Sequence, residues 1–476
     1  MELPQDISSL TALVYRLLER IEKLEAENAA LREENAQLRA ENQELKARLA
    51  QNSSNSHKPP SEEGYHKKPA LAKATGKKKG GQKGHQGNTL QMVATADQVV
   101  ACKAQVCSCG ADLSAQLHRV VETRQVFDLP EPKLQVIQYQ RMSSNCPACG
   151  KHNSGCFPAG VAAPVQYGDG VLALSVLLNN ACQVSYQKIS VLFNDLFGYR
   201  VNPSTLVKAN GQLYQGLKES EALIKKALTE STLAHFDETG IRAEGKLHRL
   251  HTCSNETHSY LFVDSHRGGQ ALRGENSILP DFTGWAVHDC LGAYFTFSAC
   301  KHAVCGAHLL RELQALVETG SKWAAAMKQL LLSLYHHSQQ GKHSVNYFTY
   351  WQKLYEDFCQ QGLREEPLPE RKNRARPKKT KGRNLLDRLI KYKDAVLAFA
   401  YHPLVPFTNN QAERELRPAK GKLKVAGCFR TFDGAATYAR IQSFMATCRK
   451  QKQNIFLQLK NALNGHTFLT MPNLTT

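Results

Sequence analysis

The most regular hydrophobic pattern in the chain is a leucine at every seventh position near its start. These leucines are Leu10, Leu17, Leu24, Leu31, Leu38 and Leu45. Between them, also seven apart, stand Val14, Ile21, Asn28, Asn35, Asn42 and Leu49. This spacing is the d and a register of a coiled coil. A buried Asn can pair with its own copy but is unsatisfied opposite an apolar residue, so Asn at three a positions favours two parallel strands.

The charges beside this stripe agree with a parallel, in-register homodimer. Each g position has the opposite sign to the following e position of a partner: Arg20 with Glu25, Glu27 with Arg32, Glu34 with Arg39 and Glu41 with Lys46. Residues 1–51 are therefore predicted to form a dimeric coiled coil. The alternative is a single amphipathic helix packed on its own domain. It fits less well, because the stripe is narrow and contains three Asn.

Residues 52–97 are rich in Ser, Pro, Gly and Lys and contain almost no side chains that could build a core. This composition predicts a flexible basic linker. Four lysines lie among its glycines: Lys77, Lys78, Lys79 and Lys83. Two interpretations fit them, a solvated tether and a salt-dependent, sequence-independent contact with DNA phosphates.

Two closely spaced cysteine pairs follow within residues 98–163. They are Cys107 with Cys109, and Cys146 with Cys149. Each pair closes on a glycine, which lets the backbone turn, and four thiolates in two such turns predict one structural zinc ion. The C-x-C spacing of the first pair is tighter than the usual C-x-x-C. The alternative is a set of unrelated buried cysteines. Cys102 and Cys156 are expected to take no part in the zinc site.

The residues between the two pairs, 125–143, alternate in polarity. This alternation predicts a hairpin that carries both cysteine pairs.

Residues 164–228 change to a helical pattern, with a short turn from Tyr199 to Val201 and a helix start signal at Pro203. Two interpretations fit equally. In the first, the segment is a helix-turn-helix whose second helix enters a major groove through Thr205, Lys208 and Asn210. In the second, it is a packing module between the zinc domain and the rest of the chain.

The overall charge points to a polyanionic partner. The 476 residues contain 61 Lys plus Arg and 42 Asp plus Glu, a formal net charge of +19. Nucleic acid is the commonest partner of so basic a chain. The start of the chain has no signal peptide and no apolar run reaches membrane length, so we expect a soluble, cytoplasmic protein without a membrane partner. In that reducing compartment, clustered cysteines indicate metal sites rather than disulfides.

Two aspartates follow short apolar runs that are typical of strands. Asp237 comes after LAHF and Asp289 after WAV. The segments 246–254 and 259–265 predict two further strands and a three-stranded meander. Two carboxylates at neighbouring strand ends repel each other unless a divalent cation neutralises them. This pattern therefore predicts a metal site.

A third acid comes from a polar helix near residue 413. Glu413 and Glu415 are two apart, so on a helix they point about 200 degrees away from each other and only one can join the site. Spacing cannot choose between them. Glu238 and Asp264 are the other acids that could be confused with the site residues.

Three sequence segments resemble the signatures of the insertion sequence 66 family of DDE transposases. They are HFDETG around Asp237, HDCLGAY around Asp289 and TNNQAERELRP around Glu413. The resemblance implies a ribonuclease-H-like α/β core in which these three carboxylates are catalytic and hold two Mg²⁺ (or Mn²⁺) ions per active site. The family pattern NNxAER selects Glu413, and leaves Arg414 and Arg417 to hold DNA phosphates. The family's zinc-binding segment and linker are also similar.

The fold class expected is therefore a multidomain α+β protein. Its predicted segments are the coiled coil (1–51), the linker (52–97), the zinc-binding domain (98–163), a helical DNA-binding or packing domain (164–228), the first part of the ribonuclease-H-like core (229–304), a helical insertion with a basic loop (305–404), the second part of the core with the catalytic Glu helix (405–455) and a C-terminal tail (456–476).

Two features of the expected insertion suggest further functional sites. Residues 371–383 contain eight Lys or Arg and no acid. They predict either a second DNA contact or a solvated loop. Cys305 and His308 form a C-x-x-H motif that is similar to one found near the scissile phosphate in several DDE transposases, which gives His308 an auxiliary catalytic role. Alternatively, with Cys300 and His302 they bind a second zinc.

The function implied by the resemblance is DNA cleavage at the ends of a mobile element, followed by joining of the freed 3′-hydroxyl to target DNA. The expected partners are the element's terminal repeats, target DNA, a second copy of the chain, higher-order assemblies on DNA and, as in some family members, small accessory proteins. Its expected location is the bacterial nucleoid in the cytoplasm. The alternatives are a DNA-binding regulator without catalysis and a nuclease that cuts without joining.

Overall fold

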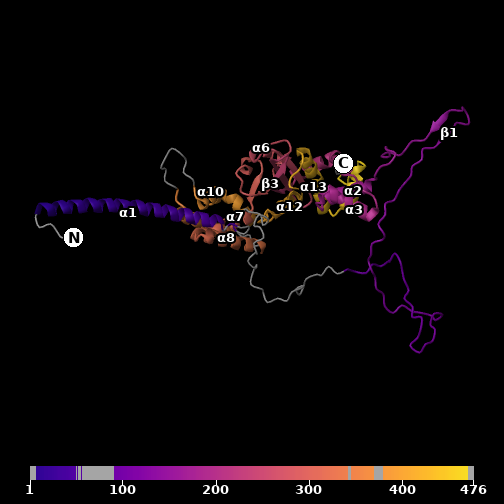
Figure 1. Cartoon of the computed structure of the whole chain (residues 1–476), viewed down its shortest axis with the longest axis horizontal. Helices are drawn as coiled ribbons and strands as arrows, with labels where there is room; N and C mark the ends of the chain where they lie inside the picture. Colours follow the sequence, from indigo (N-terminus) through magenta and orange to yellow (C-terminus); the bar gives the residue numbers. More distant parts are fainter. Residues whose placement is uncertain are drawn as a thin grey trace. The chain divides into compact units, whose positions relative to one another are not determined.

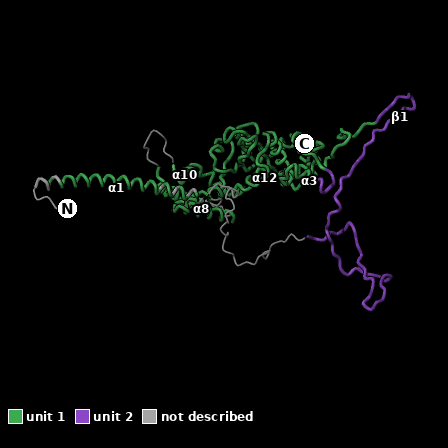
Figure 2. The backbone as a smooth tube through the Cα atoms, viewed as in Figure 1, with its two compact units in different colours: residues 1–64, 155–191, 200–476 green, residues 65–154, 192–199 purple. Residues whose placement is uncertain are grey.

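The computed structural model describes residues 7–49, 51, 55, 90–340, 345–368 and 379–469. The chain divides into two compact units, one of residues 1–64, 155–191 and 200–476, and one of residues 65–154 and 192–199 (Figure 2). The four linker lysines and residues 371–378 of the basic stretch lie outside the described residues. In the described part of the chain, no helix has both the length and the apolar character needed to cross a bilayer.

The predicted N-terminal helix is present as one unbroken element, α1 (Ile7–Leu49), which is indigo in Figure 1. The seven-residue pattern of leucines extends along almost its whole length. The helix is thus confirmed, and its pairing with a second copy stays a prediction.

The segment with the cysteine pairs contains little regular structure. Two short strands, β1 (Ser143–Asn145) and β2 (His152–Ser154), pair antiparallel on either side of the second cysteine pair. The predicted hairpin over residues 125–143 is wrong, because no strand lies between residues 125 and 142 of this described segment. Pro130 and Pro132 lie in it, and proline has no N–H group to donate to a strand ladder.

The helical segment that follows has four helices. They are α2 (Asp169–Asn180), α3 (Tyr186–Phe197), α4 (Pro203–Gly216) and α5 (Lys218–Thr229). The side chain of Asn202 caps α4 by accepting a hydrogen bond from the backbone N–H of Ser204. α4 contacts α2, α13 (Phe432–Lys450) and α14 (Ile455–Leu463). The segment predicted as a C-terminal tail therefore begins with a helix that packs in the core.

A mixed five-stranded sheet forms the centre of the larger unit. Its strands are β3 (Leu233–Ala243), β4 (Lys246–Ser254), β5 (Ser259–Asp264), β6 (Trp285–His288) and β7 (Lys301–Val304). Their order in space is β5-β4-β3-β6-β7. The first three strands form an antiparallel meander, whereas β6 and β7 run parallel to β3. The sequence predicts the first four strands and the structure confirms them, but β7 is not predicted.

The two faces of the sheet are covered by different parts of the chain. Successive residues of a strand point to opposite faces. Phe236 lies in an apolar cluster with residues of β4, β5 and α5. Ile241 packs on the other face, against α12 (Asn410–Ala426) and α13. Asp237 and Ile241 are an even number of residues apart in β3, so Asp237 points to the face that α12 covers.

Helices fill most of the interval between β7 and α12. They are α7 (Gly306–Glu318), α8 (Lys322–Gln339), α9 (Val345–Glu365), α10 (Lys381–Lys391) and α11 (Lys393–Tyr401). They share an apolar core around the buried side chains of Trp323 and Leu386, and α11 contacts β7. The helices predicted on both sides of the basic stretch are confirmed. α9, the longest of them, is not predicted by the sequence.

A close backbone contact ties the start of α7 to the chain just before α12. The backbone N–H of Gly306 donates to the carbonyl oxygen of Phe407 at 2.8 Å. A Cβ atom at Gly306 would lie 2.2 Å from the Phe407 ring. Only glycine fits this position without displacing the aromatic ring.

We expect Gly306→Ala to destabilise the protein by roughly 1–3 kcal/mol, because the added methyl group overpacks a closed contact. Unfolding in urea, followed by circular dichroism, measures this change. Gly211→Ala in α4 is the matched control, since nothing lies within 4 Å of a Cβ atom there. The control should be neutral or stabilising by about 0.5–1 kcal/mol. Equal stability of the two variants would contradict the prediction.

Candidate active site

Asp237 lies in the middle of β3, just beyond the point where its pairing with β6 ends. The parallel ladder joins Leu233 to Trp285 and ends with His235 opposite Val287. Asp237 is half-buried, and its Oδ1 accepts a hydrogen bond of 2.8 Å from the backbone N–H of Glu238. The carboxylate is thus held at the edge of the ladder.

Asp289 follows the last residue of β6. If the register of the β3–β6 ladder is continued by two residues, Asp289 falls opposite Asp237. Because parallel strands end at the same edge of a sheet, the fold brings these two aspartates together. Asp289 is half-buried, and its Oδ1 accepts from the backbone N–H of Leu291 at 3.2 Å.

Glu413 comes from the first turn of α12. Ala412 and Leu416 beside it are buried, which anchors this turn of the helix to the sheet. The Oε1 atom of Glu413 lies 3.8 Å from Nδ1 of His308 and 3.8 Å from Nη2 of Arg311, both on α7. Glu413, in the first turn of α12, therefore faces the start of α7.

The carboxylates of Asp289 and Glu413 act electrostatically on Asp237, although the three do not form a group whose ligand atoms lie within 4.8 Å of one another. The pKa of Asp237 is raised from 3.8 to about 7, first by burial, then by the charge of Asp289, and also by that of Glu413. The backbone N–H of Glu238 and the positive charge of Lys420 lower the pKa of Asp237. Three oxygen-donor groups that repel each other in a half-buried site fit a hard divalent cation.

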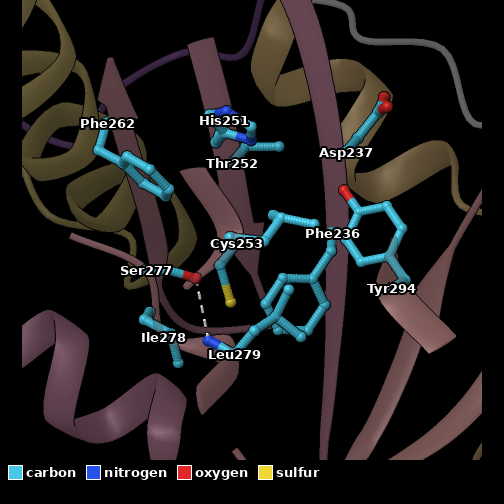
Figure 3. Close-up of a pocket in the computed structure, with 11 residues that line it drawn as sticks. Phe236, Asp237, His251, Thr252, Cys253, Phe262, Ser277, Ile278, Leu279 and Tyr294 are labelled. Carbon is cyan, nitrogen blue, oxygen red and sulfur yellow. Dashed lines mark hydrogen bonds between the residues drawn. The ribbon is translucent and has the colours of Figure 1, made fainter. Parts of the chain in front are cut away.

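Apolar packing lies behind Asp237. A cavity of about 10 Å³, with room for about one water molecule, is lined by Phe236, Cys253, Leu279, Tyr294 and others. Figure 3 shows the carboxyl group of Asp237 turned away from these side chains. The cavity is too small for a nucleotide.

The other acids have partners elsewhere. Glu238 points away from the site and lies 3.1 Å from Arg267 and 3.7 Å from His251. Glu415 forms an ion pair of 3.1 Å with Lys450.

Asp264, at the end of β5, accepts from the backbone N–H of His266 at 2.7 Å. Glu413 acts on the pKa of Asp237, whereas Glu415, Glu238 and Asp264 are held by these other partners.

Cys305 and His308 lie beside this site, at the start of α7. With Glu413 they form the one group of three or more His, Cys, Asp or Glu side chains, among the described residues, whose ligand atoms lie within 4.8 Å of one another. His302 instead approaches His288 at 3.0 Å and Cys300 at 3.8 Å. The alternative of a second zinc held by Cys300, His302, Cys305 and His308 is therefore wrong.

Each cysteine pair of the zinc segment forms its own turn. The turns close on Gly110 and Gly150, whose φ angles of 88° and 71° favour glycine. The backbone N–H groups of these glycines donate to the carbonyl oxygens of Cys107 and Cys146.

Hydrogen bonds from Cys109 lower the pKa of Cys107, and hydrogen bonds from Cys149 and Ala148 lower that of Cys146. A thiol with a lowered pKa more readily supplies the thiolate that zinc requires. The structure brings the members of each pair together, but among the described residues it does not gather all four sulfur atoms into one cluster.

The predicted DNA contacts on α4 divide into two groups. Lys208 is exposed and Thr205 is partly exposed, so both stay predictions. Asn210 is 6 % exposed, and its amide bonds Asn180, Tyr186 and the Leu206 carbonyl. The prediction for Asn210 is wrong, because its amide is already used inside the protein. On α12, Arg414 and Arg417 are exposed.

Sequence reasoning missed Arg311, and it gave no role to Asn409, which is the first residue of the NNxAER pattern. Arg311 follows His308 by one helical turn, a spacing that could have indicated a shared face. Asn409 contacts residues that are 104 to 174 positions away in the chain. No local pattern reports such contacts.

Comparison with known proteins gives three family matches. Residues 164–437 match the model of the transposase IS66 family. Residues 104–150 match the zinc-finger binding domain of transposase IS66, and residues 15–91 match a family of unknown function, DUF6444. Among curated proteins, no match to the chain was found.

The raised pKa of Asp237 predicts a pH-dependent loss of stability in the cation-free protein. The unfolded chain loses this proton near pH 4 and the folded chain near pH 7, so stability falls as the pH rises between these values. Asp237→Asn removes the penalty. In EDTA, we expect it to stabilise the protein by up to about 4 kcal/mol at pH 8 and by little at pH 4.

Urea unfolding at the two pH values measures this effect. Asp264→Asn, at the far edge of the same sheet, is the control and should show no such pH-dependent gain. If Asp237→Asn and the parent protein have the same stability at pH 8, the three carboxylates do not repel each other as described.

Proposed function

The chain belongs to the IS66 family of transposases, and from this premise we propose that it cuts DNA at the ends of its element and joins them to target DNA at the Asp237–Asp289–Glu413 site. The observation that carries the proposal is the joint electrostatic effect of Asp289 and Glu413 on Asp237. It fits a site built to hold divalent cations.

The topology supports a ribonuclease-H-like core. An antiparallel meander of three strands is followed by two strands parallel to the first, in the order β5-β4-β3-β6-β7. One acid comes from the first strand, one follows the fourth, and one opens a later helix. The order strand, strand, helix along the chain matches the three-carboxylate arrangement expected from the family resemblance.

Asp237 is affected by both other carboxylates, and in the proposal it would be shared by two Mg²⁺ or Mn²⁺ ions, with Asp289 and Glu413 each holding one. When bound, such a pair of ions activates the attacking water or 3′-hydroxyl and neutralises charge at the leaving oxygen. His308 and Arg311 face Glu413. Their role in the proposal is to orient its carboxylate and to place positive charge near the phosphate.

The DNA would approach along the exposed side of α12. Arg414, Arg417, Lys420 and Lys424 are all exposed, at spacings of three or four residues. Such spacing puts them on one side of the helix. Lys420 is also close enough to Asp237 to act on its pKa. These cations would hold phosphates next to the carboxylates.

The two cysteine pairs are proposed to hold one structural zinc ion. The matched zinc-finger segment contains Cys107, Cys109, Cys146 and Cys149. Each pair lies in a turn that closes on a glycine, which supports the proposal. With this ion bound, the segment would gain the rigidity that its few apolar contacts do not provide.

The coiled coil is proposed to make the protein a homodimer. The leucines at the d positions from Leu17 to Leu45 are 44 to 55 % exposed. A second copy would cover this stripe and pair the three a-position asparagines. Two copies suit a reaction on two element ends. Accessory proteins and association with the nucleoid belong to the same proposal.

The central test is strand transfer with DNA that carries the element's own ends. Asp237→Asn should lose cleavage and joining completely, since a shared cation ligand is removed, and should still bind DNA. Asp264→Asn should retain both reactions. Cutting without joining by the parent protein would instead identify a nuclease, and no divalent-ion-dependent cutting would identify a regulator.

The dimer has its own prediction. Leu31→Lys with Leu38→Lys should convert the full-length protein from dimer to monomer at micromolar concentration, because two charges would be buried in the seam. Light scattering measures the mass. Ala29→Lys with Ala36→Lys, on the outer side of the helix, is the matched control and should remain dimeric. A parent protein that is already monomeric would refute the coil.

A further inference from the structure

Asn409 is almost completely buried at the junction of three elements that build the site. It precedes the first residue of α12 and is 1 % exposed. Its backbone N–H donates to Sγ of Cys305 at 3.1 Å, at the start of α7. Its side chain bonds two residues of β3. The residue therefore joins the helix of Glu413 both to the strand of Asp237 and to the helix of His308.

Only one assignment of donors and acceptors satisfies both hydrogen bonds of the Asn409 side chain. The Asn409 Nδ2 donates to the carbonyl oxygen of Phe236 at 2.7 Å, and this oxygen can only accept. The Oδ1 atom then faces Nδ1 of His235 at 2.8 Å, so this nitrogen donates. The Nδ1 atom of His235 therefore carries a proton.

The Phe236 carbonyl lies beyond the end of the β3–β6 ladder, so a side chain must supply its hydrogen-bond donor. The ladder between β3 and β6 ends at His235, one residue earlier. Phe236 immediately precedes Asp237, and the Asn409 amide takes the place of a strand partner. A hydrogen bond to this carbonyl fixes the backbone from which the Asp237 carboxylate projects.

Asn409 also departs from the usual behaviour of an asparagine at this position. An Asn before the first helical residue normally caps the helix by accepting a backbone N–H bond with its side chain. Here the side chain makes no such bond within α12. The sequence thus uses a strong capping residue and directs its amide to the sheet instead, which favours a role in positioning.

We propose that Asn409 is a positioning residue that sets the separation of Glu413 from Asp237 and thereby the affinity of the site for divalent cations. The inference rests on the proposed function, since it assumes that these carboxylates hold the ions. Groups that orient metal ligands commonly change metal affinity by about 10- to 100-fold when removed. Asn409 would act in this way without contacting a cation or DNA.

The test measures Mn²⁺ binding to the full-length protein without DNA, by electron paramagnetic resonance, and the Mg²⁺ dependence of strand transfer. Asn409→Ser keeps a good capping residue but cannot reach both β3 partners. We expect its Mn²⁺ dissociation constant and its half-saturating Mg²⁺ concentration to rise by about tenfold. Strand transfer should recover at high Mg²⁺. Asn410→Ser, at the exposed neighbouring position, should match the parent protein.

Unchanged Mn²⁺ affinity in a folded Asn409→Ser variant would overturn the inference. If that variant does not fold, two variants of His235 test the inference. His235→Ala should weaken Mn²⁺ binding. His235→Asn, which restores a donor near the Nδ1 position, should recover this binding. Equal binding by both would also overturn the inference. A parent protein that binds no Mn²⁺ and joins no DNA would instead refute the proposed function, whatever the Asn409 variants do.

Discussion

The repulsion among three carboxylates in one half-buried site is the constraint on which the rest of the structure depends. Asp237 is affected most, because burial and the charges of Asp289 and Glu413 all favour its protonated form. Such a group of acids does not assemble by its own attraction. The surrounding fold must hold the acids together. Under the proposed function, divalent cations bound at this site would remove the repulsion.

The fold holds the three acids together in two different ways. The two aspartates are placed by the register of β3 and β6, so their proximity is a consequence of strand pairing alone. Glu413 has no such register, because α12 is not part of the sheet. Its position depends on the packing of Ala412 and Leu416 on the sheet, on the buried amide of Asn409 and on the tight approach of Gly306 to Phe407. The site thus combines a strong backbone framework with a helix that side chains fix in place.

This division also explains how much the sequence could predict. Apolar runs before Asp237 and Asp289 are local, and they predict the strands and the shared edge correctly. The choice of Glu413 over Glu415 came from a family resemblance, because both lie on the same polar helix. Asn409 is part of the NNxAER pattern, but its contacts could not be predicted, since His235 is 174 residues away in the chain. The wrong prediction for Asn210 has the same origin: local sequence shows a polar residue on a helix but not the long-range partners that bury it.

The long interval between Asp289 and Glu413 is only partly an insertion. β7 belongs to the sheet, and α7 follows Cys305, whose backbone N–H donates to the His288 carbonyl. The first turns of α7 also bring His308 and Arg311 to Glu413. Both elements therefore pack with the sheet that carries the two aspartates. The later helices, α8 to α11, share one apolar core with buried residues of β6 and β7, so the interval is continuous with the sheet.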